Sequence, residues 1–181
     1  MKILINAILD EYPDFKEEII GVTAEEISEL EKYCDQPLPE DYKVFLRFMG
    51  HDTGRIEAYA KEEVSRGDGT FYISKSPVDI SYEAVFKYCY KRKRMDEKRR
   101  QKLDRRFHEA GIKNLKDYLL IGINPIGNDA GHFYLDLRSD KLRVVELTET
   151  FGEIQRASSF MEFLFADHFH RPLALRLNQL S

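Results

Sequence analysis

The stretch LPEDYKVFLRFMG, residues 38–50, decides the fold of this chain. Pro39 suits the first turn of a helix because its fixed φ matches helical backbone. The apolar residues that follow at helical spacing are Tyr42, Phe45, Leu46 and Met49. Gly50 can adopt the left-handed conformation that ends many helices. The stretch therefore predicts a helix whose apolar face fills a core, and its residues serve structure rather than catalysis.

A second helix is predicted just before this stretch. Thr23 and Glu26 have the spacing of a capping box, in which the side chain of each residue accepts a hydrogen bond from the backbone amide of the other. Ile27, Leu30 and Cys34 continue the apolar face until Pro37 stops the helix. Two packed helices are expected from residues 23–50.

The middle of the chain contains turn signals and short strands between His51 and Ile80, followed by a helical pattern that begins at Tyr82. The pattern predicts one helix that continues toward Phe107. Its apolar stripe thins beyond Lys91, so the second half is expected to project into solvent.

The last third predicts an antiparallel meander. The run 118–123 is apolar on both faces and favours a central strand, the middle of the sheet. In the next strand Phe133, Leu135 and Leu137 alternate with polar neighbours, which predicts a half-buried strand. A turn then leads into a third strand at 142–147, and the capping-box spacing of Ser159 and Glu162 begins a terminal helix. The predicted fold class is α+β, a mainly antiparallel sheet with flanking helices.

Composition places the chain among single globular domains. Its 181 residues are 43% hydrophobic, which suffices for a core. The apolar N-terminal run ends at Asp10, too soon for a signal peptide or a membrane span, so a cytoplasmic protein without membrane contact is expected. Cys34 and Cys89 both occupy apolar helical positions, which favours free buried thiols over a disulfide.

Three segments in this order resemble the SUKH superfamily, which includes the yeast Smi/Knr cell-wall-assembly regulators and many bacterial immunity proteins of polymorphic toxin systems. The first is the acidic helix with the Leu-Pro stretch at 38–50, the second is 119–137 with its Gly-Asn-Asp turn, and the third is the helix at 158–164. The resemblance implies a SUKH-like domain over 23–170. An N-terminal helical extension (1–22), a basic helical elaboration (about 82–110) and a C-terminal tail (171–181) lie outside the usual pattern.

Catalytic motifs are missing from the sequence: it has no nucleophile elbow, phosphate loop, dinucleotide fingerprint or zinc-ligand spacing. The sharpest catalytic candidate joins Asn128 and Asp129 to the polar strand face of His132, Tyr134 and Asp136. An Asx-rich turn that leads into a polar sheet face explains the same residues. We expect no enzyme, no metal site and no cofactor.

Charge is divided unevenly along the chain. The segment 87–106 holds eleven Lys or Arg against three Asp or Glu, whereas the whole chain carries −4. The basic segment lacks aromatic residues in its middle for base stacking, so direct nucleic-acid binding is not expected. The eight acidic residues of the first 29 positions offer the opposite surface to a basic partner.

The resemblance then implies the function: an immunity protein that binds a cognate toxin stoichiometrically and blocks it, with nucleases among the candidate toxins. The partner-binding candidates are Glu18, Glu25, Glu29, Asn128 and Asp129. The alternative is an intracellular regulatory scaffold like the cell-wall-assembly regulators. The oligomeric state, and whether the acidic or the basic face meets the partner, stay open at this point.

Overall fold

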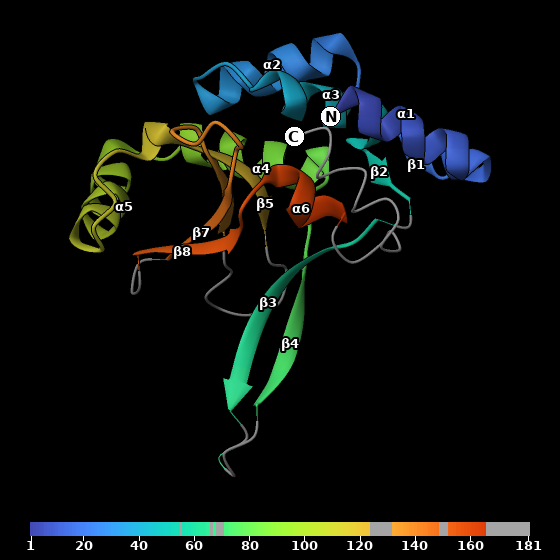
Figure 1. The fold of residues 1–181 in the computed structure, drawn as a ribbon. Coiled ribbons are helices and arrows are strands. Elements are labelled where there is room, and N and C mark those ends of the chain that lie inside the picture. Colours follow the sequence, from blue (N-terminus) through green and yellow to red (C-terminus); the bar gives the residue numbers. More distant parts are fainter. Residues whose placement is uncertain (55, 66, 68–70, 124–131, 149–151, 166–181) are drawn as a thin grey trace.

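The structure is a computed structural model and describes residues 1–54, 56–65, 67, 71–123, 132–148 and 152–165. Helices α1 (Lys2–Glu11), α2 (Ala24–Cys34) and α3 (Glu40–Met49) form its N-terminal part, with a 3-10 helix η1 (Pro13–Glu17) and a short antiparallel pair of strands, β1 (Ile19–Ile20) and β2 (Asp52–Thr53). Figure 1 shows α1, α2 and α3 gathered along one side of the molecule.

The main sheet is an antiparallel meander with the order β5-β6-β7-β8. Its strands are β5 (Tyr118–Ile123), β6 (His132–Asp136), β7 (Val144–Thr148) and β8 (Gly152–Ala157). The helix α6 (Phe160–Phe165) follows. Among the described residues, this arrangement of helices around an antiparallel sheet confirms the predicted α+β class.

A separate β-hairpin extends from the body, formed by β3 (Ala58–Ser65) and β4 (Phe71–Val78). Both strands are eight residues long, and the pair reaches away from the helices and the main sheet (Figure 1). Its base is tied to that sheet, because Asp79 and Ile123 exchange backbone hydrogen bonds of 2.8 and 2.9 Å.

The predicted capping box at the start of α2 is confirmed. The Thr23 hydroxyl accepts a hydrogen bond from the Glu26 amide at 3.2 Å, and the Glu26 carboxylate accepts one from the Thr23 amide at 2.8 Å. At the start of α6, Glu162 and Ser159 reproduce half of this pattern, with the Ser159 hydroxyl accepting from the Glu162 amide at 3.1 Å. Both caps satisfy amides that a helix start leaves without a partner.

Removing the Thr23 cap is expected to cost about 1 kcal/mol of unfolding free energy, the usual effect of replacing a capping hydroxyl by alanine. We expect Thr23→Ala to show this loss in urea unfolding. Ser28→Ala, within the same exposed helix face, is the control and is expected to change stability by less than about 0.5 kcal/mol. Equal stability of the two variants would contradict the capping role.

Helix α3 packs as its sequence predicts. Tyr42, Phe45, Leu46 and Met49 are fully buried. Tyr42 and Phe45 both meet Phe160 of α6 in edge-to-face contacts, with ring centroids 5.6 and 5.4 Å apart. This aromatic cluster holds the Leu-Pro helix against the C-terminal helix.

The prediction of a left-handed Gly50 is wrong, because its φ is −74°. The glycine is needed for space: a Cβ there would lie 2.7 Å from the Leu46 carbonyl oxygen and 2.9 Å from Cγ1 of Val22. Gly50 does follow the last residue of α3, as predicted, and the close approach of the chain before α2 explains why a glycine stands there.

The single helix predicted from Tyr82 is two helices, α4 (Tyr82–Lys93) and α5 (Glu97–Glu109). Asp96 breaks the run by capping α5, since its carboxylate accepts a hydrogen bond from the Arg99 amide at 2.9 Å. The expected exposure of the second part is confirmed, with Phe107 as the buried residue of α5.

Two expectations for the sheet are also wrong. β5 lies at an end of the strand order instead of in the middle; it is buried because α4 packs against it. β6 is buried on both faces, since Tyr134 and Asp136 on its polar side are each only 1% exposed. The alternation of apolar and polar residues in β6 predicts that its polar face is open to water, but the helical layer covers this face.

Candidate functional site

Two of the predicted partner-binding residues lie together on α2. Glu25 and Glu29 are one helical turn apart, both exposed, and neither forms an ion pair with the residues that the structure describes. Their carboxylates are therefore available to an external cation.

The structure adds carboxylates that the sequence does not group with them. Glu26 of α2 and Glu83 of α4 both reach the imidazole of His51, with Glu83 Oε1 2.6 Å from Nδ1 and Glu26 Oε1 3.2 Å from Nε2. Burial, together with the charges of Glu29, Glu26 and Glu83, raises the pKa of the neighbouring Tyr82 to about 12. We call Glu25, Glu26, Glu29 and Glu83 the acidic patch.

The other predicted binding residues lie elsewhere or outside the described part. Glu18 follows η1 and lies beside Gly54. A Cβ added at Gly54 would lie 2.9 Å from the Cβ of Glu18. Asn128 and Asp129 fall within 124–131, outside the described residues. Of the five predicted residues, the structure joins only Glu25 and Glu29 to the acidic patch.

His51 makes the acidic patch sensitive to pH. Although burial opposes it, the hydrogen bonds to Glu83 and Glu26 raise the pKa of His51 above its usual value. The folded state therefore favours the imidazolium, and this contribution to stability is complete below the pKa of an unfolded histidine, about 6.5. It is lost as the pH rises through the folded-state pKa.

We expect the difference in melting temperature between the unmodified protein and His51→Gln to shrink as the pH is raised from 6 to 9. Thermal unfolding followed by circular dichroism measures it. His108→Gln, which changes an exposed histidine of α5, is the control and should show no such trend. A difference for His51→Gln that stays constant or grows with pH would rule out the charged imidazole.

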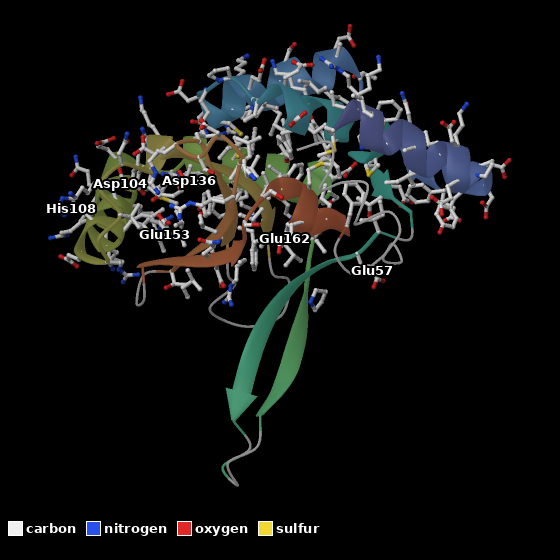
Figure 2. All side chains as sticks on the ribbon, in the orientation of Figure 1. Glu57, Asp104, His108, Asp136, Glu153 and Glu162 are labelled. Atoms are coloured by element: carbon white, nitrogen blue, oxygen red, sulfur yellow. The ribbon has the colours of Figure 1, made fainter. Side chains whose placement is uncertain are left out.

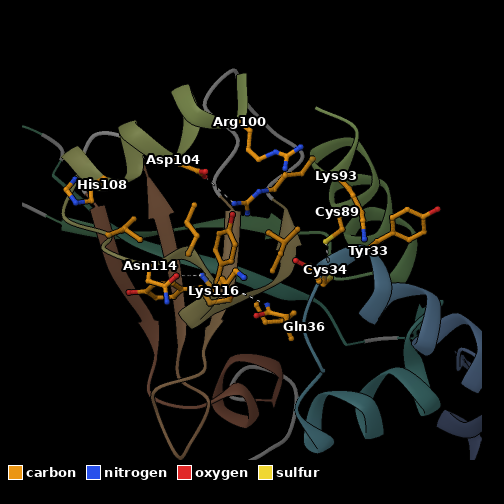
Figure 3. A pocket seen from close by; sticks show the side chains of 18 of the residues that line it. Tyr33, Cys34, Gln36, Cys89, Lys93, Arg100, Asp104, His108, Asn114 and Lys116 are labelled. Carbon is orange, nitrogen blue, oxygen red and sulfur yellow. Dashed lines mark hydrogen bonds and ion pairs between the residues drawn. The ribbon is translucent and has the colours of Figure 1, made fainter. Parts of the chain in front are cut away.

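A cavity of the described structure has the opposite charge. It is an open cleft of about 850 Å³ between the C-terminal end of α2, helices α4 and α5, the segment before β5, and β5 itself. In Figure 3, Arg100 and Asp104 border one side of it and Gln36 the other. We call it the basic cleft, after its lining cations: Arg92, Lys93, Arg100, Arg105, Lys113 and Lys116.

Three of these cations are held by the protein and three are not. Arg92 lies 3.7 Å from the Asp104 carboxylate, Lys93 donates to the Lys32 carbonyl, and Arg100 donates to the Met95 carbonyl at 3.1 Å. Those without an ion pair to any described residue are Arg105, Lys113 and Lys116, which are all exposed. Figure 2 shows Asp104 and His108 on α5, beside the sheet that carries Asp136 and Glu153.

A pair of thiols lies in the wall of the basic cleft. The sulfur atoms of Cys34 (α2) and Cys89 (α4) are 3.1 Å apart and share a hydrogen bond, which confirms the predicted free cysteines. This hydrogen bond lowers the pKa of Cys89 and raises that of Cys34.

We expect diamide to oxidise this pair to an intramolecular disulfide. Each thiol loses one hydrogen, the diazo compound is reduced to its hydrazine, and the sulfurs need to approach by about 1 Å to reach bonding distance. Intact mass should fall by about 2 Da, and both thiols should become unreactive toward maleimide. Cys34→Ser is the control and should keep one reactive thiol. Two reactive thiols in oxidised unmodified protein would contradict the contact.

The catalytic candidate of the polar strand face is not assembled in the described residues. Asp136 is engaged by Arg138, with Nε 2.7 Å away, and by Arg143, with Nη2 2.5 Å away, and it lies four positions along the extended strand from His132. The imidazole of His132 instead packs against the Tyr88 ring, with the two ring centroids 4.5 Å apart. Two other members, Asn128 and Asp129, lie outside the described residues.

Two features that the described residues lack bear on the kind of site. No group of three or more His, Cys, Asp or Glu side chains gathers as it would around a metal ion. Among the described helices, none combines the length and the apolar character needed to cross a membrane.

These elements define a class of protein: an α+β domain with an antiparallel meander, flanking helices and two surfaces of opposite charge. The chain belongs to the SMI1 / KNR4 family (SUKH-1), whose family model matches residues 21–166. The match confirms the resemblance carried by the Leu-Pro helix and the meander. No curated protein matches the chain.

Proposed function

We propose that this chain is an immunity protein, which binds a cognate toxin stoichiometrically and blocks it. The observation that carries the proposal is membership of a family that includes toxin-immunity proteins as well as the SMI1/KNR4 regulators, over residues 21–166. Family membership leaves both roles open, and the acidic patch favours a partner with a basic surface.

The acidic patch supports binding in a specific way. Glu25 and Glu29 are exposed and unpaired among the described residues, so a partner's cation does not have to displace an internal one. Glu26 and Glu83 are organised around His51 at the rim. Such a surface speeds encounter with a basic partner through electrostatic steering. A nuclease with a basic active-site cleft has the matching charge.

We also propose that the chain has no catalytic activity of its own. The engagement of Asp136 by two arginines removes the carboxylate that would have oriented His132. Neutralisation by occupation of the toxin's surface needs no turnover, cofactor or metal.

Co-expression in a bacterial host with the product of the adjacent gene tests the proposal. We expect that product to stop growth when expressed alone, and growth to return when this chain is expressed with it. If the adjacent product is harmless alone and does not co-purify with the chain, the immunity function is wrong. The regulatory scaffold then becomes the better account of the family match.

A further inference from the structure

The basic cleft is not needed for a partner that meets the acidic patch, yet it has the features of a ligand site. Its volume of about 850 Å³ lies within the range of about 300–1,000 Å³ that is usual for small-molecule sites. Five parts of the chain meet there: residues 33–36, 89–93, 100–108, 112–120 and Tyr134.

Charge indicates the class of ligand. Six cations line the cleft, against the two carboxylates of Asp35 and Asp104. Asp104 already faces Arg92 at 3.7 Å, whereas Arg105, Lys113 and Lys116 have no ion pair with the residues that the structure describes. Unpaired lysine and arginine side chains around one concavity suit phosphate oxygens, which accept several charge-assisted hydrogen bonds at once.

The floor of the cleft suits a different part of the same ligand. It is lined by apolar side chains: Ile112, Leu115, Leu119 and Leu120. Tyr33 adds an aromatic wall, with the Lys93 ammonium 5.7 Å from its ring centroid. A ligand that fills the cleft therefore combines an anionic end at the rim with a flat, weakly polar body toward the floor.

One polar group at the cleft gives an independent reason to expect a ligand. Tyr134 of β6 is 1% exposed and lines the cleft, and its hydroxyl makes no well-aligned hydrogen bond with the described residues, although the Tyr88 side chain lies near it. A buried hydroxyl without a partner costs stability, and such groups are uncommon in folded proteins. Burial also raises its pKa well above the usual value, so it remains a neutral donor.

We propose that the basic cleft binds a nucleoside phosphate, with its phosphates at Arg105, Lys113 and Lys116 and its base or sugar toward Tyr134. The same phosphate chemistry is available from a free nucleotide or from an RNA strand. The limited size of the cleft and its buried hydroxyl favour the free nucleotide, because a strand would need a continuous basic groove with stacking aromatics.

Isothermal titration calorimetry tests this with three probes: ADP, inorganic pyrophosphate and a twelve-nucleotide single-stranded RNA. We expect ADP to bind with a dissociation constant on the order of 100 μM. Pyrophosphate should bind at least about fivefold more weakly, since it lacks the part that contacts the floor. Absence of heat with millimolar ADP overturns the proposal, as does equal affinity for pyrophosphate, or RNA binding without ADP binding.

Variants locate the site. Arg105→Gln/Lys116→Gln removes two unpaired cleft cations and should weaken ADP binding at least about tenfold. Lys98→Gln/Lys102→Gln removes the same charge from α5 residues outside the cleft and should leave the affinity unchanged. Tyr134→Phe should weaken binding without lowering the melting temperature, since it deletes an unsatisfied hydroxyl. Equal loss in the cleft and control variants overturns the assignment.

Discussion

Asp136→Ala is expected to lower the unfolding free energy by about 3 kcal/mol. The Asp136 carboxylate is 1% exposed and bridges two arginines, with Arg138 Nε at 2.7 Å and Arg143 Nη2 at 2.5 Å. Breaking a buried ion pair from one side costs about 3–5 kcal/mol, because a charge is left without compensation. We take the lower value, since both arginines are partly exposed and both keep Glu153 as a partner.

Urea unfolding at pH 7 measures this loss. Asp140→Ala, in the exposed turn after β6, is the matched control and should change stability by less than about 0.5 kcal/mol.

The stabilisation by Asp136 should also depend on pH. Although burial raises the pKa of Asp136, hydrogen bonds from Arg138 and Arg143 lower it below its usual value. Its contribution is therefore present above the unfolded-state pKa and is lost as the pH falls through the folded-state value. If the unmodified protein and Asp136→Ala still differed fully in unfolding free energy at a pH below the folded-state pKa of Asp136, the ionic role would be contradicted.

Reversing the charge of the acidic patch is expected to have the largest effect on function. Glu25→Lys/Glu29→Lys should lower the association rate constant with the toxin at least about tenfold at low ionic strength. The effect should shrink in 0.5 M salt, where the Debye length falls to about 4 Å and steering is screened. Both residues are exposed and unpaired among the described residues, so folding should be preserved.

Surface plasmon resonance with immobilised toxin gives both rate constants. The matched control is Glu109→Lys/Asp140→Lys, which makes the same change of charge at exposed positions away from the patch. Equal slowing in the two variants would show that net charge alone acts, and would remove the acidic patch from the interface.

Local signals in the sequence predict much of the fold. The capping residues Thr23 and Ser159 mark the starts of α2 and α6, and the apolar face of α3 predicts its burial. The turns between apolar runs predict the antiparallel meander. Each of these signals acts over a few residues, which is why the sequence is sufficient for them.

Local patterns in the sequence do not predict the features that depend on tertiary packing. The burial of β5 on both faces resembles that of a central strand, but α4 and the contact of Ile123 with Asp79 cover an end strand here. β8 has little apolar patterning; ion pairs of Glu153 with Arg138 and Arg143 join it to the connection between β6 and β7. Such long-range pairs have no local pattern.

The candidate sites show the same division. Glu25 and Glu29 could be placed on one helical face from their spacing, whereas the grouping of Glu26, His51 and Glu83 spans 57 positions and needs the fold. The basic segment was evident from composition. Its role as one wall of a cleft depended on the break at Asp96, a capping signal that the sequence does contain.

Direct binding to the adjacent gene product is the measurement that tests the immunity function most closely. The two purified proteins would be mixed and their complex analysed by size-exclusion chromatography with light scattering. The account predicts a stable complex of fixed stoichiometry in which the toxin's activity is lost. Separate elution of the two proteins, with the toxin fully active, would contradict it.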